Sequence, residues 1–582
     1  MKILLTAINA KYIHSNLAVY SLRSYAKPFR DQIELAEYTI NHQTDDILSD
    51  IYTRKPDVLC FSCYIWNISV IRALIRELRL LRPELPIWVG GPEVSYECGE
   101  FLKENPRVTG IMRGEGEATF LELCEHYVNQ ESELSKIRGL VFRDEEDNIV
   151  FTPERPPLSL DALPFCYEDL TDFEHRIIYY ESSRGCPFRC SYCLSSVEKS
   201  LRFRSLPLVY RELQFFLDHK VPQVKFVDRT FNCDHAHAMA IWEFLREHDN
   251  GITNFHFEIS ADLLTDEEIA LLATLRPGLI QLEIGVQSTN PQTVEEIRRS
   301  MNLERLETVV RKIKSQGNIH QHLDLIAGLP YEDYQSFARS FDRIYALHPE
   351  QLQLGFLKVL KGSWLYENRD AYGIICHEAP PYEVMATRWL SYDELLEIKK
   401  VEEMLEVYYN SGQFTRTMQV LEQAFDSHFT MFWELGQYYE RNHLFDVNHS
   451  RIRRSEILLE FIREKGLEPI ELYQETLTFD LYCREKMKSR PAWAPEPSLY
   501  REELKHLKEK NPGLKGRNVH LEPFYYDLEH LPQRQRTCGE EQDFPTRKPE
   551  RSYYLFDYED RNPLTGQANV TKLPCQMTQT PL

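Results

Sequence analysis

The sequence contains no apolar run near the roughly 20 residues that a membrane-spanning helix needs. Its N-terminus, MKILLTAINAKYIHS, has only a short apolar stretch and no small-residue cleavage site, so we do not expect a signal peptide. No internal repeat of fixed period and no low-complexity tract occurs along the chain. Together with 42% hydrophobic and 27% charged residues, these absences predict a globular, cytoplasmic protein without a membrane partner.

The chain also lacks basic character and any sign of a disulfide framework. Its formal net charge of −22 repels phosphate backbones, which disfavours nucleic acid as a partner. Thirteen cysteines, an odd number spread over a long chain, indicate free thiols plus a metal site in a reducing compartment. With 582 residues the chain is too long for one hydrophobic core, so we expect several domains.

Residues 1–125 alternate short apolar runs with helical patterns. The runs occupy 2–8, 33–39, 57–66, 86–92 and 108–114, and helical patterns occur near 16–27, 44–54 and 69–81. This rhythm predicts an α/β domain with a doubly wound parallel sheet, which binds ligands at the carboxyl ends of its strands. Small or polar residues follow three of the strands and would let the backbone approach a large ligand: Ser62, Gly90, Gly91, Gly114 and Glu115. A simple turn is the alternative interpretation of the glycines.

A second series of strand and helix patterns begins near residue 175. Its apolar runs occupy 176–183, 221–228, 254–260, 278–288, 319–330 and 352–363. Six such repeats predict a partial (β/α)6 barrel with its site at the carboxyl ends of the strands. Charged side chains on buried strands are costly unless they are paired or face a ligand. We therefore expect a cavity lined by some of the polar residues near these ends: Asp228, Glu258, Ser260, Glu283, Gln287, Ser288 and Asp324.

The segment SSRGCPFRCSYC, residues 182–193, follows the first strand of the predicted barrel and carries Cys186, Cys190 and Cys193. Three thiolates are too few for a closed structural zinc site, which takes four ligands. A four-iron four-sulfur cluster held by three cysteines keeps one iron open to another ligand. Cys166 or His175 could complete a zinc tetrahedron, but both lie outside the loop, so the cluster is the favoured interpretation.

This loop, with Tyr192 before its last cysteine, closely resembles the signature of the radical S-adenosylmethionine (SAM) superfamily. The resemblance implies that the three cysteines bind the cluster and that the open iron binds SAM. It further implies that Tyr192 contacts the adenine and that Arg299 pairs with the SAM carboxylate. An exposed helix arginine is the alternative for Arg299. Asp228, Glu258 and Gln287 are further candidates for contact with SAM or substrate.

The N-terminal sheet resembles the cobalamin-binding domain that one branch of this superfamily carries. The resemblance implies cobalamin near Ser62, the Gly90–Gly91 pair, Gly114 and Glu115. The motif Asp-x-His-x-x-Gly, which supplies a histidine to cobalt in many cobalamin methyltransferases, is absent, because the first strand is followed by NAKYIHSNLA. His14 lies off that motif, so we expect cobalt without a protein histidine.

The two resemblances imply a cobalamin-dependent radical SAM enzyme, and we expect a methyltransferase that acts on an unactivated carbon. The alternatives are an enzyme that rearranges, cyclises or oxidises its substrate, and a redox or cobalamin sensor without turnover. The substrate, a small molecule or a peptide, stays open, and the electron donor would be a flavodoxin or a ferredoxin.

The expected domain boundaries follow these patterns. We expect a cobalamin-binding domain over 1–130, a linker over 131–174, the barrel over 175–370 and a mainly helical extension over 371–582 that ends in a hairpin at 551–573. The extension resembles the poorly characterised C-terminal part of a subgroup of these proteins. It could cover the open side of the barrel, or it could serve association with a partner.

Overall fold

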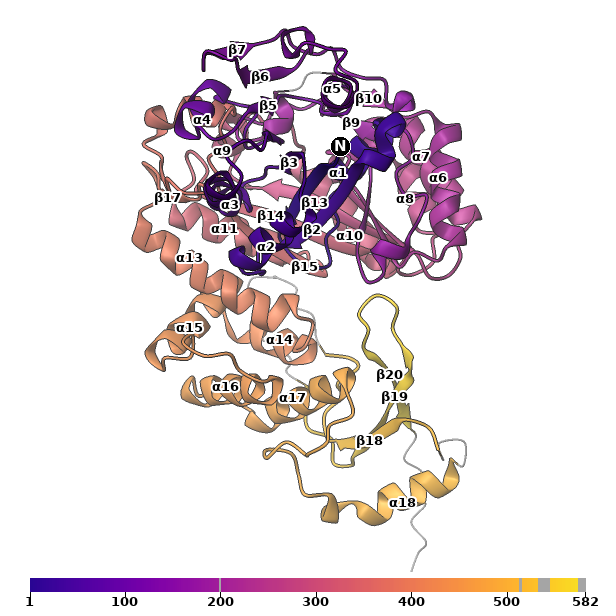
Figure 1. Ribbon diagram of the computed structural model, residues 1–582. Coiled ribbons are helices and arrows are strands. Elements are labelled where there is room, and N and C mark those ends of the chain that lie inside the picture. Colours follow the sequence, from indigo (N-terminus) through magenta and orange to yellow (C-terminus); the bar gives the residue numbers. More distant parts are fainter. Residues whose placement is uncertain (198–199, 512–515, 532–544, 574–582) are drawn as a thin grey trace, which may run out of the picture. The chain divides into compact units, whose positions relative to one another are not determined.

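The computed structural model describes residues 1–197, 200–511, 516–531 and 545–573 (Figure 1). Contacts within the chain divide it into two compact units. The first contains residues 1–319, 326–333 and 355–391, and the second contains 320–325, 334–354 and 392–582. Among the helices in the described ranges, none is long and apolar enough to cross a membrane.

The N-terminal sheet is built from short, buried apolar strands, and it confirms the predicted doubly wound fold. Five strands pair in parallel in the order β2-β1-β3-β4-β5. They are β1 (Ile3–Asn9), β2 (Ile33–Thr39), β3 (Val58–Ser62), β4 (Ile87–Gly90) and β5 (Gly110–Met112). The helices between and after them are α1 (Leu17–Tyr25), α2 (Thr44–Arg54), α3 (Ile68–Leu81), α4 (Cys98–Glu104) and α5 (Glu117–Cys124). Helix α2 packs against α3, and α1 packs against α5.

The sheet extends into the segment that the sequence patterns predicted as a linker. Strand β6 (Leu140–Arg143) pairs antiparallel with β5, and β7 (Ile149–Phe151) pairs antiparallel with β6. The carboxylate of Asp144 accepts the backbone N–H groups of Glu146 and Asn148 at 3.0 and 2.8 Å, which stabilises the turn between them. Residues 131–174 are therefore not only a connection, because this hairpin forms the edge of the first sheet.

The second sheet has six strands, in the order β15-β14-β13-β12-β11-β8, as expected for a six-repeat partial barrel. They are β8 (Ile178–Tyr180), β11 (Gln223–Phe226), β12 (Asn254–Ile259), β13 (Ile280–Gln287), β14 (His320–Ala327) and β15 (Gln351–Phe356). The accompanying helices are α6 (Leu206–Asp218), α7 (His235–Glu247), α8 (Asp266–Leu272), α9 (Pro291–Glu296), α10 (Leu303–Gln316) and α11 (Tyr334–Tyr345). Strands β8, β11, β12 and β13 pair in parallel.

One face of these four parallel strands is polar. The register pairs Tyr179 with Lys225 and Glu258 with Glu283. All four side chains are half-buried, whereas their neighbours along the strands are buried apolar residues. Because side chains alternate between the two faces of a strand, the polar residues share one face.

Two short segments complete the first unit around the cysteine loop. Strand β9 (Ser183–Arg184) pairs antiparallel with β10 (Arg202–Phe203). After β15 come α12 (Trp364–Glu367) and the antiparallel pair β16 (Ile375–Cys376) and β17 (Val384–Ala386). The first unit therefore includes residues beyond the predicted end of the barrel at residue 370.

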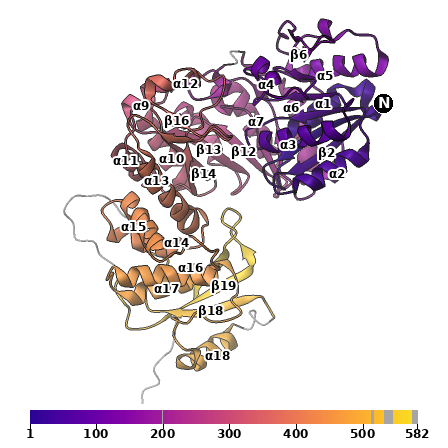
Figure 2. The ribbon, with the colours of Figure 1, turned by 60° about the vertical axis from the view of Figure 1, so that its left-hand side comes forward.

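The second unit is mainly helical, as predicted (Figure 2). Its helices after residue 391 are α13 (Tyr392–Leu405), α14 (Thr415–Leu421), α15 (His428–Arg441), α16 (Arg451–Glu464), α17 (Ile470–Arg484) and α18 (Arg501–Lys510). The segment predicted as a hairpin contains β19 (Ser552–Arg561) and β20 (Ala568–Leu573), which pair antiparallel, and β18 (Val519–Phe524) joins them. Residues 512–515, 532–544 and 574–582 of the predicted extension lie outside the described ranges.

Candidate functional site

The three cysteines of the predicted cluster loop lie just after β9 as free thiols, with Cys190 buried and the other two half-buried. Gly185 has a φ of +98°, and a Cβ at this position would overlap the carbonyl oxygen of Ser200. Only glycine fits this turn without strain. Three soft sulfur donors on one short loop are the donor set that an iron–sulfur cluster with an open iron requires.

Asp228 lies behind this loop. Its side chain is only 1% exposed. Its carboxylate accepts bonds from the Ser182 N–H and from the Ser182 and Ser183 hydroxyls at 3.0, 2.6 and 2.6 Å. Burial raises the pKa of Asp228 to about 6. The structure does not bring Asp228 to the cavity, so its contacts make it a positioning residue for the start of the cysteine loop.

Arg299 lies between the cysteine loop and strand β13, which carries Gln287. Nη1 of Arg299 lies 3.9 Å from Sγ of Cys190, and its Nη2 donates to the Gly285 carbonyl. Burial favours the neutral form, but Tyr192 and Cys190 raise the pKa of the Arg299 guanidinium. Nε of Arg299 and Oε1 of Gln287 are buried and form no hydrogen bond with any described residue. Unsatisfied buried polar atoms near the Cys190 thiol suit a polar ligand such as SAM.

Glu258 belongs to a charge cluster on the polar face of the barrel strands. Nζ of Lys225 lies 3.9 Å from a Glu258 oxygen and 2.9 Å from Oε2 of Glu283. Nε2 of His256 lies 2.9 Å from the same Glu283 oxygen. The sequence patterns did not indicate Lys225 and His256, although each is a polar residue between two apolar ones on its strand.

A cavity of about 1310 Å³ opens within the first unit. Its lining includes Asn9 at the end of β1, Gly91 after β4, Gly114 after β5, Gly185 of the cysteine loop and Val227 after β11. The carboxyl ends of the first sheet and the mouth of the barrel therefore border one space. This volume and this position suit a large ligand that contacts both sheets.

The predicted cobalamin residues differ in their relation to this cavity. Gly91, Gly114 and Glu115 line it, whereas Ser62 and Gly90 do not. Gly114 has a φ of +78° and open space where a Cβ would lie, so a ligand can approach its backbone. Gly91 has a φ of +112°, and a Cβ there would overlap the Cys63 carbonyl oxygen. Position 91 therefore needs glycine because the chain itself lies close to it, and not, as predicted, because a ligand approaches its backbone.

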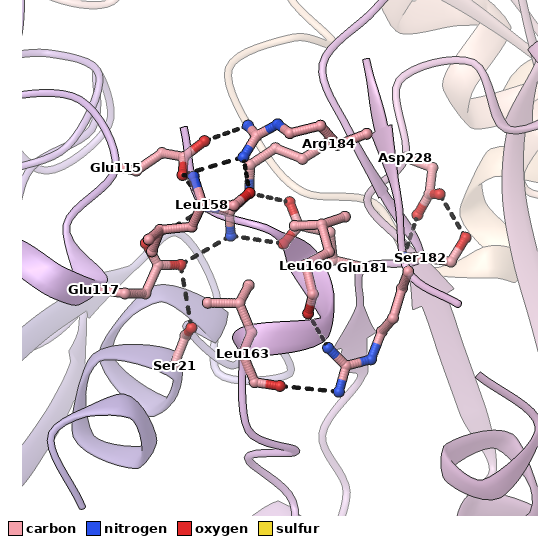
Figure 3. Close-up of polar contacts among 12 residues, drawn as sticks. Ser21, Glu115, Glu117, Leu158, Leu160, Leu163, Glu181, Ser182, Arg184 and Asp228 are labelled. Atoms are coloured by element: carbon pink, nitrogen blue, oxygen red, sulfur yellow. Dashed lines mark hydrogen bonds and ion pairs between the residues drawn. The ribbon is translucent and has the colours of Figure 1, made fainter. Parts of the chain in front are cut away.

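Arg184 connects the cysteine loop to the end of the first sheet (Figure 3). Its Nη2 donates to Glu181 at 2.7 Å and to Glu117 at 2.8 Å, and its Nη1 lies 3.4 Å from Glu115. Glu115 also accepts bonds from Arg202 and from the Leu158 N–H. Burial alone would raise the pKa of Glu115, but Arg202, the Leu158 amide and Arg184 together lower it. Glu115 is therefore an ion-pair partner that lines the cavity, and its contact with a cofactor remains a prediction.

His14 joins β1 to β8 at the cavity wall. Its Nδ1 lies 2.6 Å from the hydroxyl oxygen of Tyr179, and both residues line the cavity. Burial lowers the pKa of His14, and the charges of Lys11 and Lys225 lower it further. One ring nitrogen of this neutral histidine is thus engaged by the barrel. That it does not bind cobalt remains a prediction.

Comparison with known families identifies both halves of this site. Residues 3–124 match the B12 binding domain, and residues 180–344 match the radical SAM superfamily. Residues 370–542 match a family described as a protein of unknown function. These domains imply cobalamin, SAM and a four-iron four-sulfur cluster.

Similar curated proteins include two methyltransferases. The chain is 25% identical over 433 residues to 2-(S-pantetheinyl)-carbapenam-3-carboxylate methyltransferase of Streptantibioticus cattleyicolor, covering 66% of this chain and 61% of the relative. It is 25% identical over 425 residues to the cobalamin-dependent radical SAM methyltransferase TokK of Streptomyces tokunonensis, covering 65% and 61%. The matches thus span about three fifths of the length of these two relatives.

Solved structures share the fold at low sequence identity. The radical enzyme OxsB with aqua-cobalamin bound matches with a TM-score of 0.57 and 15% identity, over 88% of this chain and 81% of that chain. TsrM from Kitasatospora setae with cobalamin and a [4Fe-4S] cluster matches with a TM-score of 0.52 and 18% identity, over 67% and 82%. The chain therefore combines a B12-binding domain with a radical SAM domain, as cobalamin-dependent radical SAM enzymes do.

Proposed function

We propose that this protein is a cobalamin-dependent radical SAM methyltransferase that acts on an unactivated carbon of a small molecule or peptide. The observation that carries the proposal is the shared cavity, which borders both the carboxyl ends of the first sheet and the cysteine loop. The methyltransferases among its relatives support this choice over rearrangement, cyclisation or oxidation. An arrangement of this kind lets two cofactors meet one substrate.

In the proposed reaction, the cluster with SAM would supply a hydrogen-abstracting radical and cobalamin would supply the methyl group. Cys186, Cys190 and Cys193 would hold the cluster. The buried Arg299 Nε and Gln287 Oε1 would bind polar groups of SAM, with Tyr192 beside them. Open space beside Gly114 would let the corrin approach the backbone.

The remaining residues of the site would act by positioning. Asp228 orients the start of the cysteine loop through Ser182 and Ser183. Arg184 holds the same loop against Glu115 and Glu117 at the end of the first sheet. Together they would keep the two cofactor sites at a fixed separation across the cavity, which a reaction through a reactive radical requires.

We further propose a cytoplasmic location and a flavodoxin or ferredoxin as electron donor. The cysteines of the described ranges are free thiols, as is usual in a reducing compartment. A reductant is a general need of radical SAM chemistry. The formal net charge of −22 disfavours nucleic acid as a partner.

The test is anaerobic incubation of the reconstituted protein with reductant, methyl-labelled SAM and fractionated cell extract. We expect deoxyadenosine, S-adenosylhomocysteine and a labelled product. Deoxyadenosine without S-adenosylhomocysteine or label transfer would instead favour rearrangement, cyclisation or oxidation. Absence of deoxyadenosine in the presence of a fully loaded cluster would contradict an enzymatic role and favour a sensor.

A further inference from the structure

The arginines that line the cavity differ in their partners. Four of them pair with a carboxylate: Arg113 with Glu154 at 3.4 Å, Arg155 with Glu122 at 2.7 Å, Arg184 with Glu117 at 2.8 Å and Arg204 with Glu212 at 2.6 Å. Arg229 also lines the cavity and is exposed, but it forms no ion pair or side-chain hydrogen bond with any residue in the described ranges. Its guanidinium is thus free to bind a ligand.

The chain holds Arg229 close to the cysteine loop. Arg229 directly follows Asp228, whose buried carboxylate is bonded to Ser182 and Ser183. On its other side, Oγ1 of Thr230 lies 3.8 Å from Sγ of Cys186. The backbone on both sides of Arg229 is therefore tied to the loop that would carry the cluster.

Arg229 shares the cavity with a residue that follows a strand of the first sheet. Tyr64, two residues beyond the end of β3, lines the same cavity. Burial raises the pKa of the Tyr64 hydroxyl, and the nearby charge of Arg229 opposes that rise. Arg229 thus borders the cavity beside the cysteine loop, and under the proposed function this cavity receives the substrate and both cofactors.

We propose that Arg229 binds an anionic group of the substrate, a carboxylate or a phosphate, and thereby determines which carbon faces the radical. The inference rests on the proposed function and extends it to a substrate class. A guanidinium presents a planar fork of donors that matches either anion with two parallel bonds. Another anion that could reach this position is the phosphate in the nucleotide tail of cobalamin, so the experiment separates the two.

The experiment uses the full chain, loaded with cluster and cobalamin, and titrates it calorimetrically with inorganic phosphate and with succinate. Arg229→Gln removes the cation, and Arg229→Lys keeps the charge without the fork. Arg246→Gln is the matched control, because Arg246 lies on α7, pairs with Glu247 and does not line the cavity. We expect the wild type to bind one of the anions and Arg229→Gln to bind it about tenfold more weakly or worse. Arg229→Lys should be intermediate, and the control should match the wild type.

Iron and cobalt contents are measured on every variant. Unchanged contents together with weaker anion binding in Arg229→Gln support the proposal. Loss of cobalamin in that variant assigns Arg229 to the cobalamin phosphate and overturns it. A wild type that binds neither anion, or a variant that binds as tightly as the wild type, also overturns it. None of these readouts needs SAM cleavage, so a failure here is distinct from a failure of the proposed methyl transfer.

Discussion

Cys190 is the buried member of the cysteine trio, and Arg299 is its charged neighbour. Replacing Cys190 by Ala removes one of three thiolate ligands and leaves the surrounding packing nearly unchanged. We expect a soluble protein that has lost most of its iron, its brown cluster absorption and all SAM cleavage. Cys60→Ala is the control, because Cys60 is also buried but lies on β3, and it should keep wild-type iron. A Cys190→Ala protein with wild-type iron content would show that the cluster assignment is wrong.

Asp228 gives a prediction on pH. Burial raises its pKa from 3.8 to about 6, so between these values the folded chain binds more protons at this site than the unfolded chain. The contribution of this site to the free energy of unfolding is therefore greatest below pH 4. It falls by on the order of 2–3 kcal/mol as the pH rises through about 6.

Thermal unfolding of the wild type and of Asp228→Asn between pH 4 and 7 checks this expectation. Asparagine does not titrate, so the melting temperature of the wild type minus that of the variant should decrease as the pH rises. Comparison with the variant cancels the other carboxylates that titrate in the same range. A difference that stays constant with pH would argue that Asp228 is already ionised at pH 4.

At the scale of elements, the turn between β9 and the cysteine loop depends on one glycine. The Gly185→Ala substitution places a Cβ on a residue with a left-handed φ and against the Ser200 carbonyl oxygen. We expect it to lower the free energy of unfolding by about 3 kcal/mol or more. Because the strain falls on the segment that carries the cysteines, iron content should drop with stability. Gly251→Ala is the control, since Gly251 also has a positive φ, +75°, but no atom within 4 Å of a new Cβ. The Gly251→Ala protein should lose only about 1 kcal/mol of unfolding free energy and keep its iron. If both variants contained the same amount of iron, the strain at Gly185 would not affect the cysteine loop, and the prediction would be wrong.

At the scale of the whole molecule, the division into two units decides where a shortened chain can end without losing part of the first unit. Residues 371–391 belong to the first unit, where Tyr372 donates to Glu296 and Tyr382 donates to Glu93. A chain that ends at residue 370 would therefore lose part of the unit that carries the cavity. The expected role of the extension, to cover the open side of the barrel, remains a prediction.

A chain that ends at residue 391 keeps the whole first unit. It also keeps α11 of the second unit but lacks α15, which packs against α11. In the second unit, Phe341 of α11 contacts Phe429 and Phe432 of α15 with ring centroids 5.6 and 5.9 Å apart. Exposing such rings costs about 1.5–3 kcal/mol each and creates an apolar patch. We expect most of this shortened protein to be insoluble, as measured by the soluble fraction after expression beside the full chain. A soluble monomer of this length would mean that α11 does not need α15.

The sequence by itself determined the features that depend on neighbours along the chain. Alternation of apolar runs and helical patterns predicted both sheets, because burial of a strand or a helix face shows in the period of its own residues. The three cysteines predicted a cluster because one short loop holds all of its protein ligands. The hairpin of β6 and β7 was missed because its turn is a charged run that is also typical of a linker.

Only the tertiary structure decided what the individual polar residues do. Asp228 and Glu115 are both carboxylates at strand ends, yet one is bonded to Ser182, 46 residues away, and the other to Arg202, 87 residues away. Arg229 differs from the other cavity arginines in being exposed and in having no carboxylate partner among the described residues. Hydrogen bonds and ion pairs extend over about 3 Å in space and not along the sequence, so the fold selects which polar groups are already paired and which remain for a ligand.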